Sequence, residues 1–245
     1  MDMRDKRFVV TGGGSGIGRE TAMMLAAAGA EVGVVGRRSD VLDQAVASVG
    51  GTTWSMACDV SSEDDVSRLA EAVKARWGGL DGLVNNAGIA PMATLDDTDL
   101  QMWERIFAIN TRGPYLTCRH LGPMLKEGRS PSVVSVSSSL AVRAIPRMAA
   151  YNASKAALNQ LTRSLALEWA PVVRVNAVMP AVVDTPIHGS RGMDSSQVEQ
   201  MALIHPLQRI GQPVDVASLI VYLLSDAASW MTGAVVPIDG GMTAA

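Results

Sequence analysis

Short runs of consecutive apolar residues recur along the chain, and longer stretches with helical spacing separate them. Most of these runs are rich in valine and do not alternate with polar positions. That pattern is typical of strands that are covered on both faces, as in a parallel sheet. It predicts seven strands, over residues 8–11, 31–35, 53–58, 82–85, 132–136, 172–178 and 235–238.

The stretches between the predicted strands carry signals that start and stop helices. The helical spacing of residues 16–28 ends at Gly29, a residue that favours the C-terminal end of a helix. Ser39 is a capping residue and is expected to begin the second helix. Residues 98–126 are expected to form one helix, or two that are separated near Gly113. The other helices are expected over residues 61–77, 149–169 and 213–224.

The alternation of strands and helices predicts an α/β fold with right-handed crossovers. We expect residues 1–245 to form a single doubly wound Rossmann domain, in which a seven-stranded parallel sheet has helices on both faces. Hydrophobic residues make up 48% of the chain and charged residues 18%, which is a globular composition. One region is irregular: residues 186–212 are polar and contain glycine, as is typical of a lid over an active site.

Charge and cysteine content exclude several classes of function. The net charge is −3, from 21 basic and 24 acidic residues, so no basic field is expected to bind nucleic acid. The apolar runs are far shorter than the roughly 18 residues of a membrane span. Cys58 and Cys118 belong to no pair with metal-binding spacing, and two buried, reduced thiols are expected. These features predict a cytoplasmic protein without a nucleic-acid or membrane partner.

A glycine-rich turn follows the first predicted strand, and a helix begins directly after it. Glycines there let the backbone approach a pyrophosphate, and the helix N-terminus offers unpaired N–H groups to the anion. The spacing T-G-x-x-x-G-x-G differs from the common G-x-G-x-x-G, and the alternative is a plain turn. Its position in a strand–helix–strand unit favours a dinucleotide. The expected contacts are Thr11, Gly12, Gly14, Ser15, Gly16, Ile17 and Gly18.

The end of the second predicted strand indicates which dinucleotide binds. An NAD site usually has an acidic residue there, which binds the ribose 2′-hydroxyl. This sequence has Arg37 and Arg38 instead, and Asp40 is expected to belong to the following helix N-terminus. Arginine binds a 2′-phosphate through charge-assisted hydrogen bonds, although two solvated arginines are the alternative. We therefore expect NADP(H) as the preferred cofactor, with NAD(H) as the second choice.

Tyr151 and Lys155 lie four residues apart near the start of the helix predicted over residues 149–169. This spacing puts both side chains on one face, one turn apart. Tyrosine has an ordinary pKa of about 10 and is a poor base at neutral pH, and a nearby ammonium lowers that pKa. The pair therefore suits general acid–base chemistry near pH 7. From the spacing alone, the alternative is an exposed tyrosine and lysine on an amphipathic helix.

Taken in order, these motifs resemble those of the short-chain dehydrogenase/reductase family over essentially the whole chain, and of 3-oxoacyl-carrier-protein reductases within it. The turn at residues 11–18 is similar to the family's cofactor turn, and residues 85–88 resemble its N-N-A-G segment. Residues 239–241 resemble its C-terminal D-G-G segment. The resemblance implies further cofactor contacts from Asp59, Val60, Asn86, Ala87, Gly88, Tyr151, Lys155, Pro180, Val183 and Thr185.

The resemblance also implies a catalytic set. Many family members have a serine thirteen positions before the tyrosine, and this spacing selects Ser138. The alternatives in the same segment are Ser135, Ser137 and Ser139. The full implied set is Asn110, Ser138, Tyr151 and Lys155.

In the mechanism that the resemblance implies, Ser138 and Tyr151 bind the substrate oxygen while a hydride moves between the nicotinamide and the substrate carbon. Tyr151 gives its proton to a carbonyl oxygen, or takes one from an alcohol in the reverse direction. Lys155 holds the ribose hydroxyls and lowers the pKa of Tyr151. Asn110 positions a water that links Lys155 to solvent. The hydride chemistry belongs to the cofactor, and the protein supplies position and field.

One residue departs from the family pattern after the sixth predicted strand. The P-G segment of the family reads Pro180-Ala181 in this chain. Glycine tolerates backbone angles that alanine does not. Ala181 is therefore expected to shift the cofactor slightly, or to force different backbone angles near the nicotinamide.

The substrate is expected to be a small molecule with a carbonyl or alcohol group. Residues 139–147, the lid and the helix after Asn110 are expected to contact it. An arginine that points into the pocket would indicate an anionic substrate, and the alternative is exposure to solvent. The candidate side chains are Arg143, Arg147, His188, Arg191 and His205. The three histidines of the chain lack metal-binding spacing, and no metal is expected.

A homo-oligomer is expected from the same resemblance, because similar family members are commonly tetramers that pair helices equivalent to residues 110–126 and 153–169. A homotetramer is expected before a dimer. The apolar residues of the second helix belong either to that interface or to the core. They include Leu158, Leu161, Leu165 and Trp169.

Two other classes of function compete with an oxidoreductase. The first is a catalytically silent dinucleotide-binding regulator or scaffold, and the complete catalytic set argues against it. The second is a lyase or dehalogenase on the same fold. Those variants typically lose the glycine turn or exchange the lysine, and this sequence keeps both.

Overall fold

Seven parallel strands form one sheet in the order β3-β2-β1-β4-β5-β6-β7. The computed structural model describes residues 1–191 and 194–244, without the side chains at 189–191, 195, 198 and 199. The predicted α/β fold with a seven-stranded, doubly wound parallel sheet is therefore confirmed. The strands are β1 (Arg7–Thr11), β2 (Glu31–Gly36), β3 (Thr53–Ala57), β4 (Gly82–Asn85), β5 (Ser132–Val136), β6 (Arg174–Pro180) and β7 (Val235–Ile238).

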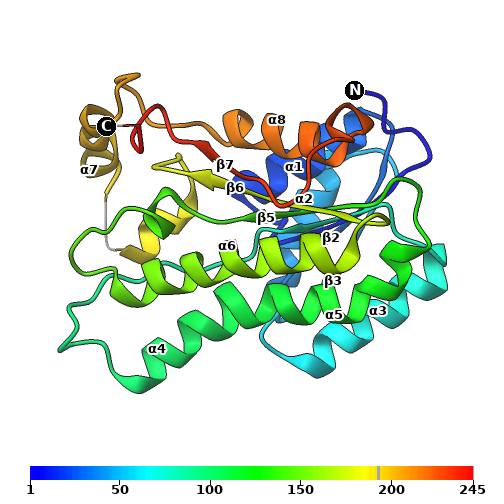
Figure 1. The fold of residues 1–245 in the computed structure, drawn as a ribbon, viewed down its shortest axis with the longest axis horizontal. Coiled ribbons are helices and arrows are strands. Elements are labelled where there is room, and N and C mark those ends of the chain that lie inside the picture. Colours follow the sequence, from blue (N-terminus) through cyan, green and yellow to red (C-terminus); the bar gives the residue numbers. More distant parts are fainter. Residues whose placement is uncertain (192–193, 245) are drawn as a thin grey trace.

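Helices cover both faces of the sheet (Figure 1). Successive strand residues point to opposite faces, so Val10 packs in one core with Leu25 and Ile220, whereas Val9 packs in the other with Leu69 and Leu121. This double burial explains the continuous apolar runs of the sequence. The first core lies under α1 (Gly16–Ala27), α2 (Ser39–Val49) and α8 (Pro213–Leu224), and the second under α3 (Glu63–Trp77), α5 (Gly113–Lys126) and α6 (Ala149–Trp169).

One predicted strand begins two residues later than expected, and the helix that begins at Ser39, as predicted, lacks the expected side-chain cap. The strand predicted over residues 172–178 is β6, which begins at Arg174, because the N–H groups of Val172 and Val173 bond to the Trp169 carbonyl at the end of α6. Ser39 is the first residue of α2 and not its cap, and no side chain caps that helix.

No break separates the helices predicted over residues 98–126. Instead α4 (Leu100–Phe107) continues through a π-helical turn, η1 (Ala108–Arg112), into α5. Gly113 and Pro114 are the first residues of α5, and the wider turn before them accommodates the missing proline donor. Gly113 and Pro114 therefore mark the end of a π turn that contains Asn110, and the helix is continuous through this turn.

The segment predicted as a lid consists largely of short helical turns. They are η3 (Pro186–Arg191), α7 (Ser195–Gln200) and η4 (Met201–Ile204), and residues 192–193 lie outside the described part of the chain. The expectation of an irregular loop over residues 186–212 was therefore incomplete.

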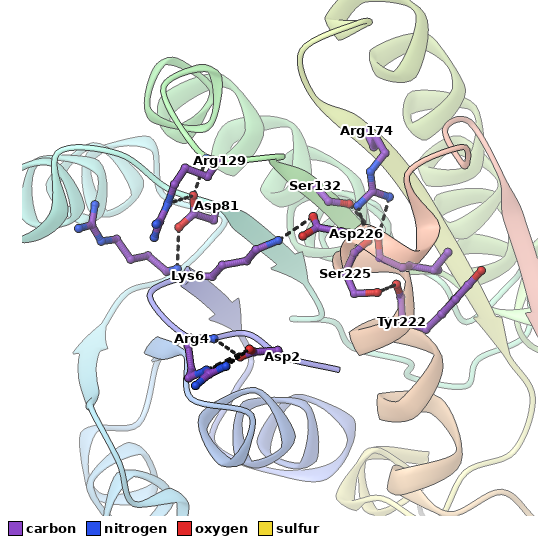
Figure 2. A network of polar contacts seen from close by, with 12 residues as sticks. Asp2, Arg4, Lys6, Asp81, Arg129, Ser132, Arg174, Tyr222, Ser225 and Asp226 are labelled. Atoms are coloured by element: carbon purple, nitrogen blue, oxygen red, sulfur yellow. Dashed lines mark hydrogen bonds and ion pairs between the residues drawn. The ribbon is translucent and has the colours of Figure 1, made fainter.

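A polar network holds the amino ends of the strands (Figure 2). The buried carboxylate of Asp81 accepts hydrogen bonds from the backbone N–H groups of Arg7, at 2.9 Å, and Arg129, at 2.6 Å. Lys6 forms an ion pair of 2.8 Å with Asp226. These contacts link the segments that lead into β1, β4 and β5 at the sheet edge opposite the candidate site.

At the carboxyl edge, the turns after β1 and β4 are tied together. The Thr11 hydroxyl accepts hydrogen bonds from the backbone N–H groups of Asn86, at 3.0 Å, and Ala87, at 3.2 Å. The Asn86 amide in turn donates to the carbonyls of Thr11, at 3.0 Å, and Gly12, at 3.1 Å. Gly12 has a φ of 63°, and a Cβ there would lie 2.8 Å from Asn86 Nδ2. Only glycine fits this position without strain.

Gly18 closes the same turn from the first coil of α1. A Cβ at Gly18 would lie 2.4 Å from both the Gly12 carbonyl oxygen and Asn86 Nδ2. Neither atom is the end of a flexible side chain that can move away, because the asparagine holds two carbonyls.

We predict that Gly18→Ala lowers the free energy of unfolding by about 3 kcal/mol or more, because the methyl group overpacks this turn. Urea denaturation measures the change. Gly122→Ala is the matched control, since Gly122 is also helical and its Cβ would meet only the Trp169 ring, at 3.3 Å. The control is expected to change the free energy by less than about 1 kcal/mol. Equal losses in the two variants would contradict this account of the turn.

Candidate active site

A cavity of about 490 Å³ runs along the carboxyl ends of the strands. Its walls come from the segments that follow β1 through β7, on both sides of the boundary between β1 and β4 where the strand order reverses. Ligands of doubly wound sheets bind at such a switch point. The predicted residues that line it are Gly12, Gly14, Ser15, Gly16, Ile17, Arg37, Arg38, Asp59, Val60, Asn86, Ala87, Gly88, Ser138, Tyr151, Lys155, Pro180, Val183 and Thr185.

Three predicted residues lie behind the cavity wall. Thr11, Gly18 and Asn110 are buried and do not line the cavity. Thr11 and Gly18 shape the glycine turn through the contacts described above. The structure therefore places Thr11 and Gly18 behind the residues that line the cavity, whereas the sequence predicted that both contact the cofactor.

Tyr151 and Lys155 lie one turn apart on α6, and both face the cavity. Only 5% of Tyr151 and 4% of Lys155 is exposed. The Lys155 Nζ atom lies 5.9 Å from the centre of the Tyr151 ring and donates a 2.7 Å hydrogen bond to the Val136 carbonyl. Burial lowers the pKa of Lys155 to about 8. The ammonium is therefore still charged at pH 7, next to the phenol.

The serine cluster after β5 contains one hydroxyl suited to a ligand. Ser137 Oγ donates to the Lys155 carbonyl, at 3.3 Å, and Ser139 Oγ donates to the Met242 sulfur, at 3.8 Å. Ser138 Oγ accepts a 3.1 Å hydrogen bond from the backbone N–H two residues on. Within the described part of the chain, the Ser138 hydroxyl donates to no acceptor, so its proton can point into the cavity.

Asn110 connects three parts of the site from within the π turn. Its Oδ1 accepts from the Ile89 N–H, and its Nδ2 donates to the Ile89 carbonyl, both at 3.0 Å. The same Nδ2 donates to Ser154 Oγ on α6, at 3.1 Å. A Cβ at Gly88 would lie 3.3 Å from Asn110 Oδ1 and 3.5 Å from Lys155 Nζ. The Asn110 amide is thus used inside the protein and fixes the wall behind Lys155.

The glycine turn forms a cradle that suits a phosphate group. Ser15 is the N-cap of α1, yet its side chain makes no cap hydrogen bond, and the first turn of α1 has no acidic residue. A Cβ at Gly14 would lie 2.9 Å from Val41 Cγ1, and one at Gly16 3.0 Å from Thr185 Cγ2. The helix N–H groups and the positive end of the helix dipole therefore face a narrow space that favours an anion.

The far end of the cavity carries two cations and one carboxylate. Arg37 and Arg38 are exposed, line the cavity, and have no ion pair or hydrogen bond from their guanidinium groups to any residue that the structure describes. Asp59 Oδ1 accepts from the N–H and the hydroxyl of Ser61, at 2.9 and 2.7 Å. These contacts orient the Asp59 carboxylate, and Asp40 lies in the first turn of α2 as expected.

Two of the three arginines predicted near the substrate, Arg143 and Arg147, lie outside the cavity wall. Arg143 Nη1 donates a 2.6 Å hydrogen bond to the Met242 carbonyl, and Arg147 is exposed with a left-handed φ of 65°. Neither lines the cavity. The side chain of Arg191 lies outside the described part of the structure. The expectation that Arg143 or Arg147 contacts the substrate therefore finds no support in the structure.

Of the two histidines proposed for the substrate, only His188 lines the cavity. Its Nε2 donates to the Val183 carbonyl, at 2.7 Å, and so fixes the chain after β6. His205 is only 2% exposed and lies outside the cavity wall, with Nδ1 bonded to the Met201 carbonyl at 2.9 Å. The expectation that His205 contacts the substrate therefore finds no support in the structure.

Sequence reasoning missed the apolar wall around Tyr151. Ile145, Ala181, Ile187 and Met242 line the cavity and pack in one cluster with Tyr151. Ala181 is not among the described residues with a left-handed φ, so its backbone is not strained at this position. The sequence placed Ile145 and Ile187 in segments expected near the substrate and Ala181 near the nicotinamide, but it could not show that they form one cluster with Met242, because they come from four separate segments.

The described residues form neither a metal-binding cluster nor a membrane-spanning helix. No group of three or more histidine, cysteine or acidic side chains has an arrangement that could hold a metal ion. No helix in the same part of the chain has the length and apolar character needed to span a membrane.

Comparison with known proteins agrees with this geometry. A family model described as Enoyl-(Acyl carrier protein) reductase matches residues 12–243. The chain is 38% identical to 2,5-dichloro-2,5-cyclohexadiene-1,4-diol dehydrogenase of Sphingobium indicum, over 99% of each protein. It is 39% identical to cis-4-hydroxycyclohexanecarboxylate dehydrogenase of Sinomonas cyclohexanicum, over 96% of each.

A solved structure gives the same result. The structure of 3-ketoacyl-(acyl-carrier-protein) reductase from Brucella melitensis complexed with NADH matches with a TM-score of 0.93 and 33% identity, covering 99% of this chain and 100% of that one. The chain therefore belongs to the short-chain dehydrogenase/reductase family, as an oxidoreductase of the 3-oxoacyl-carrier-protein-reductase-like type that acts on CH–OH or C=O groups with a nicotinamide dinucleotide.

Proposed function

We propose that this enzyme moves a hydride between NADP(H) and a small secondary alcohol or its ketone, with Tyr151 as the general acid and base. The observation that carries the proposal is the pairing of Tyr151 with the buried ammonium of Lys155 in the wall of the cavity. An ammonium so close to a phenol favours the ionised phenol. Tyr151 can then exchange a proton near neutral pH.

Each residue of the catalytic set has a distinct task in this proposal. The bound nicotinamide supplies or accepts the hydride. Ser138 donates its free hydroxyl proton to the substrate oxygen, and Tyr151 gives a proton to that oxygen or takes one from it. Lys155 supplies the positive charge that stabilises the ionised phenol. Asn110 holds the wall behind Lys155 through its bonds to Ile89 and Ser154.

The preference for NADP(H) rests on Arg37 and Arg38. Both residues follow β2 and line the same cavity as the oriented carboxylate of Asp59, and their guanidinium groups have no partner in the part of the chain that the structure describes. A ribose 2′-phosphate would offer each of them a charge-assisted hydrogen bond. The comparisons leave the choice open, because the Brucella melitensis enzyme is complexed with NADH.

The relatives guide the choice of substrate. Both dehydrogenases named above act, by name, on a hydroxyl group of a six-membered carbon ring. We include ring alcohols and ring ketones in the proposed substrate class, since the apolar wall around Tyr151 suits a carbon ring.

The remaining expectations are proposals of the same kind. We propose a cytoplasmic homotetramer, with a dimer as the alternative, paired through α5 and α6. Leu158 is buried in the core. Trp169 packs against the second core and also lines a shallow hollow of about 260 Å³ between these two helices.

We also propose that residues 186–212 close over the bound substrate as a lid, because Ile187 and Met201 line the cavity.

No observation favours the competing functions. The relatives named above are dehydrogenases or reductases, which gives no sign of a silent regulator or scaffold. The glycine turn and Lys155, which lyase and dehalogenase variants typically change, are both present.

We predict that Tyr151→Phe lowers kcat for ketone reduction by at least about a thousandfold, because the proton donor is lost. The dissociation constant for NADPH, measured by fluorescence titration, should change less than about threefold. Tyr115→Phe on α5 is the control, since that hydroxyl accepts a hydrogen bond from Arg119 on the surface. It should turn over like the wild type. Near-normal turnover by Tyr151→Phe would refute the assignment.

We predict that Arg37→Ala weakens NADPH binding by about tenfold or more and leaves NADH binding nearly unchanged, because only NADPH carries the 2′-phosphate. Calorimetry with both cofactors measures the two constants. Arg105→Ala, at an exposed position on α4, is the control for a simple loss of positive charge. If Arg37→Ala weakens both cofactors equally, Arg37 does not bind the 2′-phosphate.

A further inference from the structure

After β7 the chain turns back toward the cavity, and hydrogen bonds fix this turn. The Asp239 carboxylate accepts from the N–H groups of Gly241, at 3.0 Å, and Thr243, at 2.9 Å. Gly240 and Gly241 have left-handed φ angles of 60° and 88°, which favour glycine. The Leu207 N–H donates to the Gly240 carbonyl, at 3.1 Å, so the turn also rests on the segment after η4.

Arg143 ties this turn to the loop that carries the candidate catalytic serine. Its Nη1 donates a 2.6 Å hydrogen bond to the Met242 carbonyl. Its own backbone N–H bonds to the Ser139 carbonyl, at 3.1 Å, in the short turn that Ser138 begins. The guanidinium therefore acts as a clamp between two segments 99 residues apart. It is not a free receptor for an anion.

The clamp sets the position of the Met242 side chain. This side chain is 5% exposed and packs with Leu140, Met148 and Tyr151. Its sulfur accepts a weak hydrogen bond from Ser139 Oγ, at 3.8 Å. Because Met242 also lines the cavity, its side chain adjoins the same space as the Tyr151 ring.

Other apolar side chains line this part of the cavity as well. Ile145, Ala181 and Ile187 pack on the same cluster from three other segments. Arg37 and Asp59, by contrast, line the cavity where it passes the ends of β2 and β3. A substrate that reaches Tyr151 thus meets aliphatic and thioether groups beyond its reacting oxygen.

Resting on the function proposed above, we propose that Met242 is a specificity-determining residue, which Arg143 positions. The methionine side chain fills the end of the cavity, so that a compact, uncharged ring reaches Tyr151 and a bulkier ring does not. A methylene group more or less in an apolar pocket changes discrimination by about 10- to 200-fold. Shortening Met242 by three heavy atoms should therefore admit the bulkier ring.

The test compares two uncharged ketones, cyclohexanone and 4-tert-butylcyclohexanone, on protein saturated with NADP⁺. Calorimetry gives their dissociation constants without any need for turnover. The wild type is expected to bind the compact ring at least about tenfold more tightly, and Met242→Ala is expected to reduce this preference by about tenfold or more. Met242→Leu, which nearly keeps the core volume, should shift it in the same direction by less.

Three further variants separate specificity from stability. Met124→Ala removes an equally buried methionine from the second core, away from the cavity, and should leave the preference unchanged. Arg143→Gln should reduce the preference as Met242→Leu does, because the turn loses its clamp. Arg143→Lys keeps a cationic donor for the Met242 carbonyl and should therefore show the wild-type preference for the compact ring. Binding of NADP⁺ should remain the same in all variants.

The proposal is overturned if the wild type binds both rings equally or binds neither. It is also overturned if folded Met242→Ala or Met242→Leu keeps the wild-type preference. Hydride transfer is measured separately with NADPH. Selective binding without hydride transfer would contradict the proposed function and leave the role of Met242 standing.

Discussion

Lys155 donates a 2.7 Å hydrogen bond to the Val136 carbonyl at the carboxyl end of β5, and its ammonium is almost entirely buried. Burying a cation is unfavourable, and the lowered pKa of Lys155, about 8, reflects that desolvation. No acidic residue in the described chain pairs with this ammonium. A strongly perturbed lysine in a cleft is typical of a functional site, and here the ammonium lies 5.9 Å from the centre of the Tyr151 ring.

Much of the surrounding structure serves to hold this charge in place. The strand end at Val136 supplies the acceptor, and α6 supplies both Lys155 and Tyr151. The π turn brings Asn110 against the wall behind the ammonium, and Gly88 leaves the space that both groups need. The polar network at the opposite edge of the sheet keeps the strands in register, so that the carboxyl edge is left for ligands.

The sequence was most informative where structure is local. Valine-rich runs predicted a buried parallel sheet, and the glycine turn with its following helix placed the cavity correctly. The sequence could not show that Asn110 lies in a π turn, because the signal of Gly113 and Pro114 suggested a break. It also could not show the clamp from Arg143 to Met242, since that contact joins segments 99 residues apart and involves a backbone carbonyl. Tertiary packing determines such contacts.

The most direct test of this account is the titration of Lys155 itself. The chain has four lysines, so isotope labelling of their Cε atoms gives a simple NMR spectrum, and Lys155→Met assigns the signal. We predict a midpoint for Lys155 near pH 8, with the charged ammonium below that pH and the neutral amine above it. A midpoint at the ordinary lysine value of about 10.4 would contradict the buried ammonium on which the proposed catalysis depends.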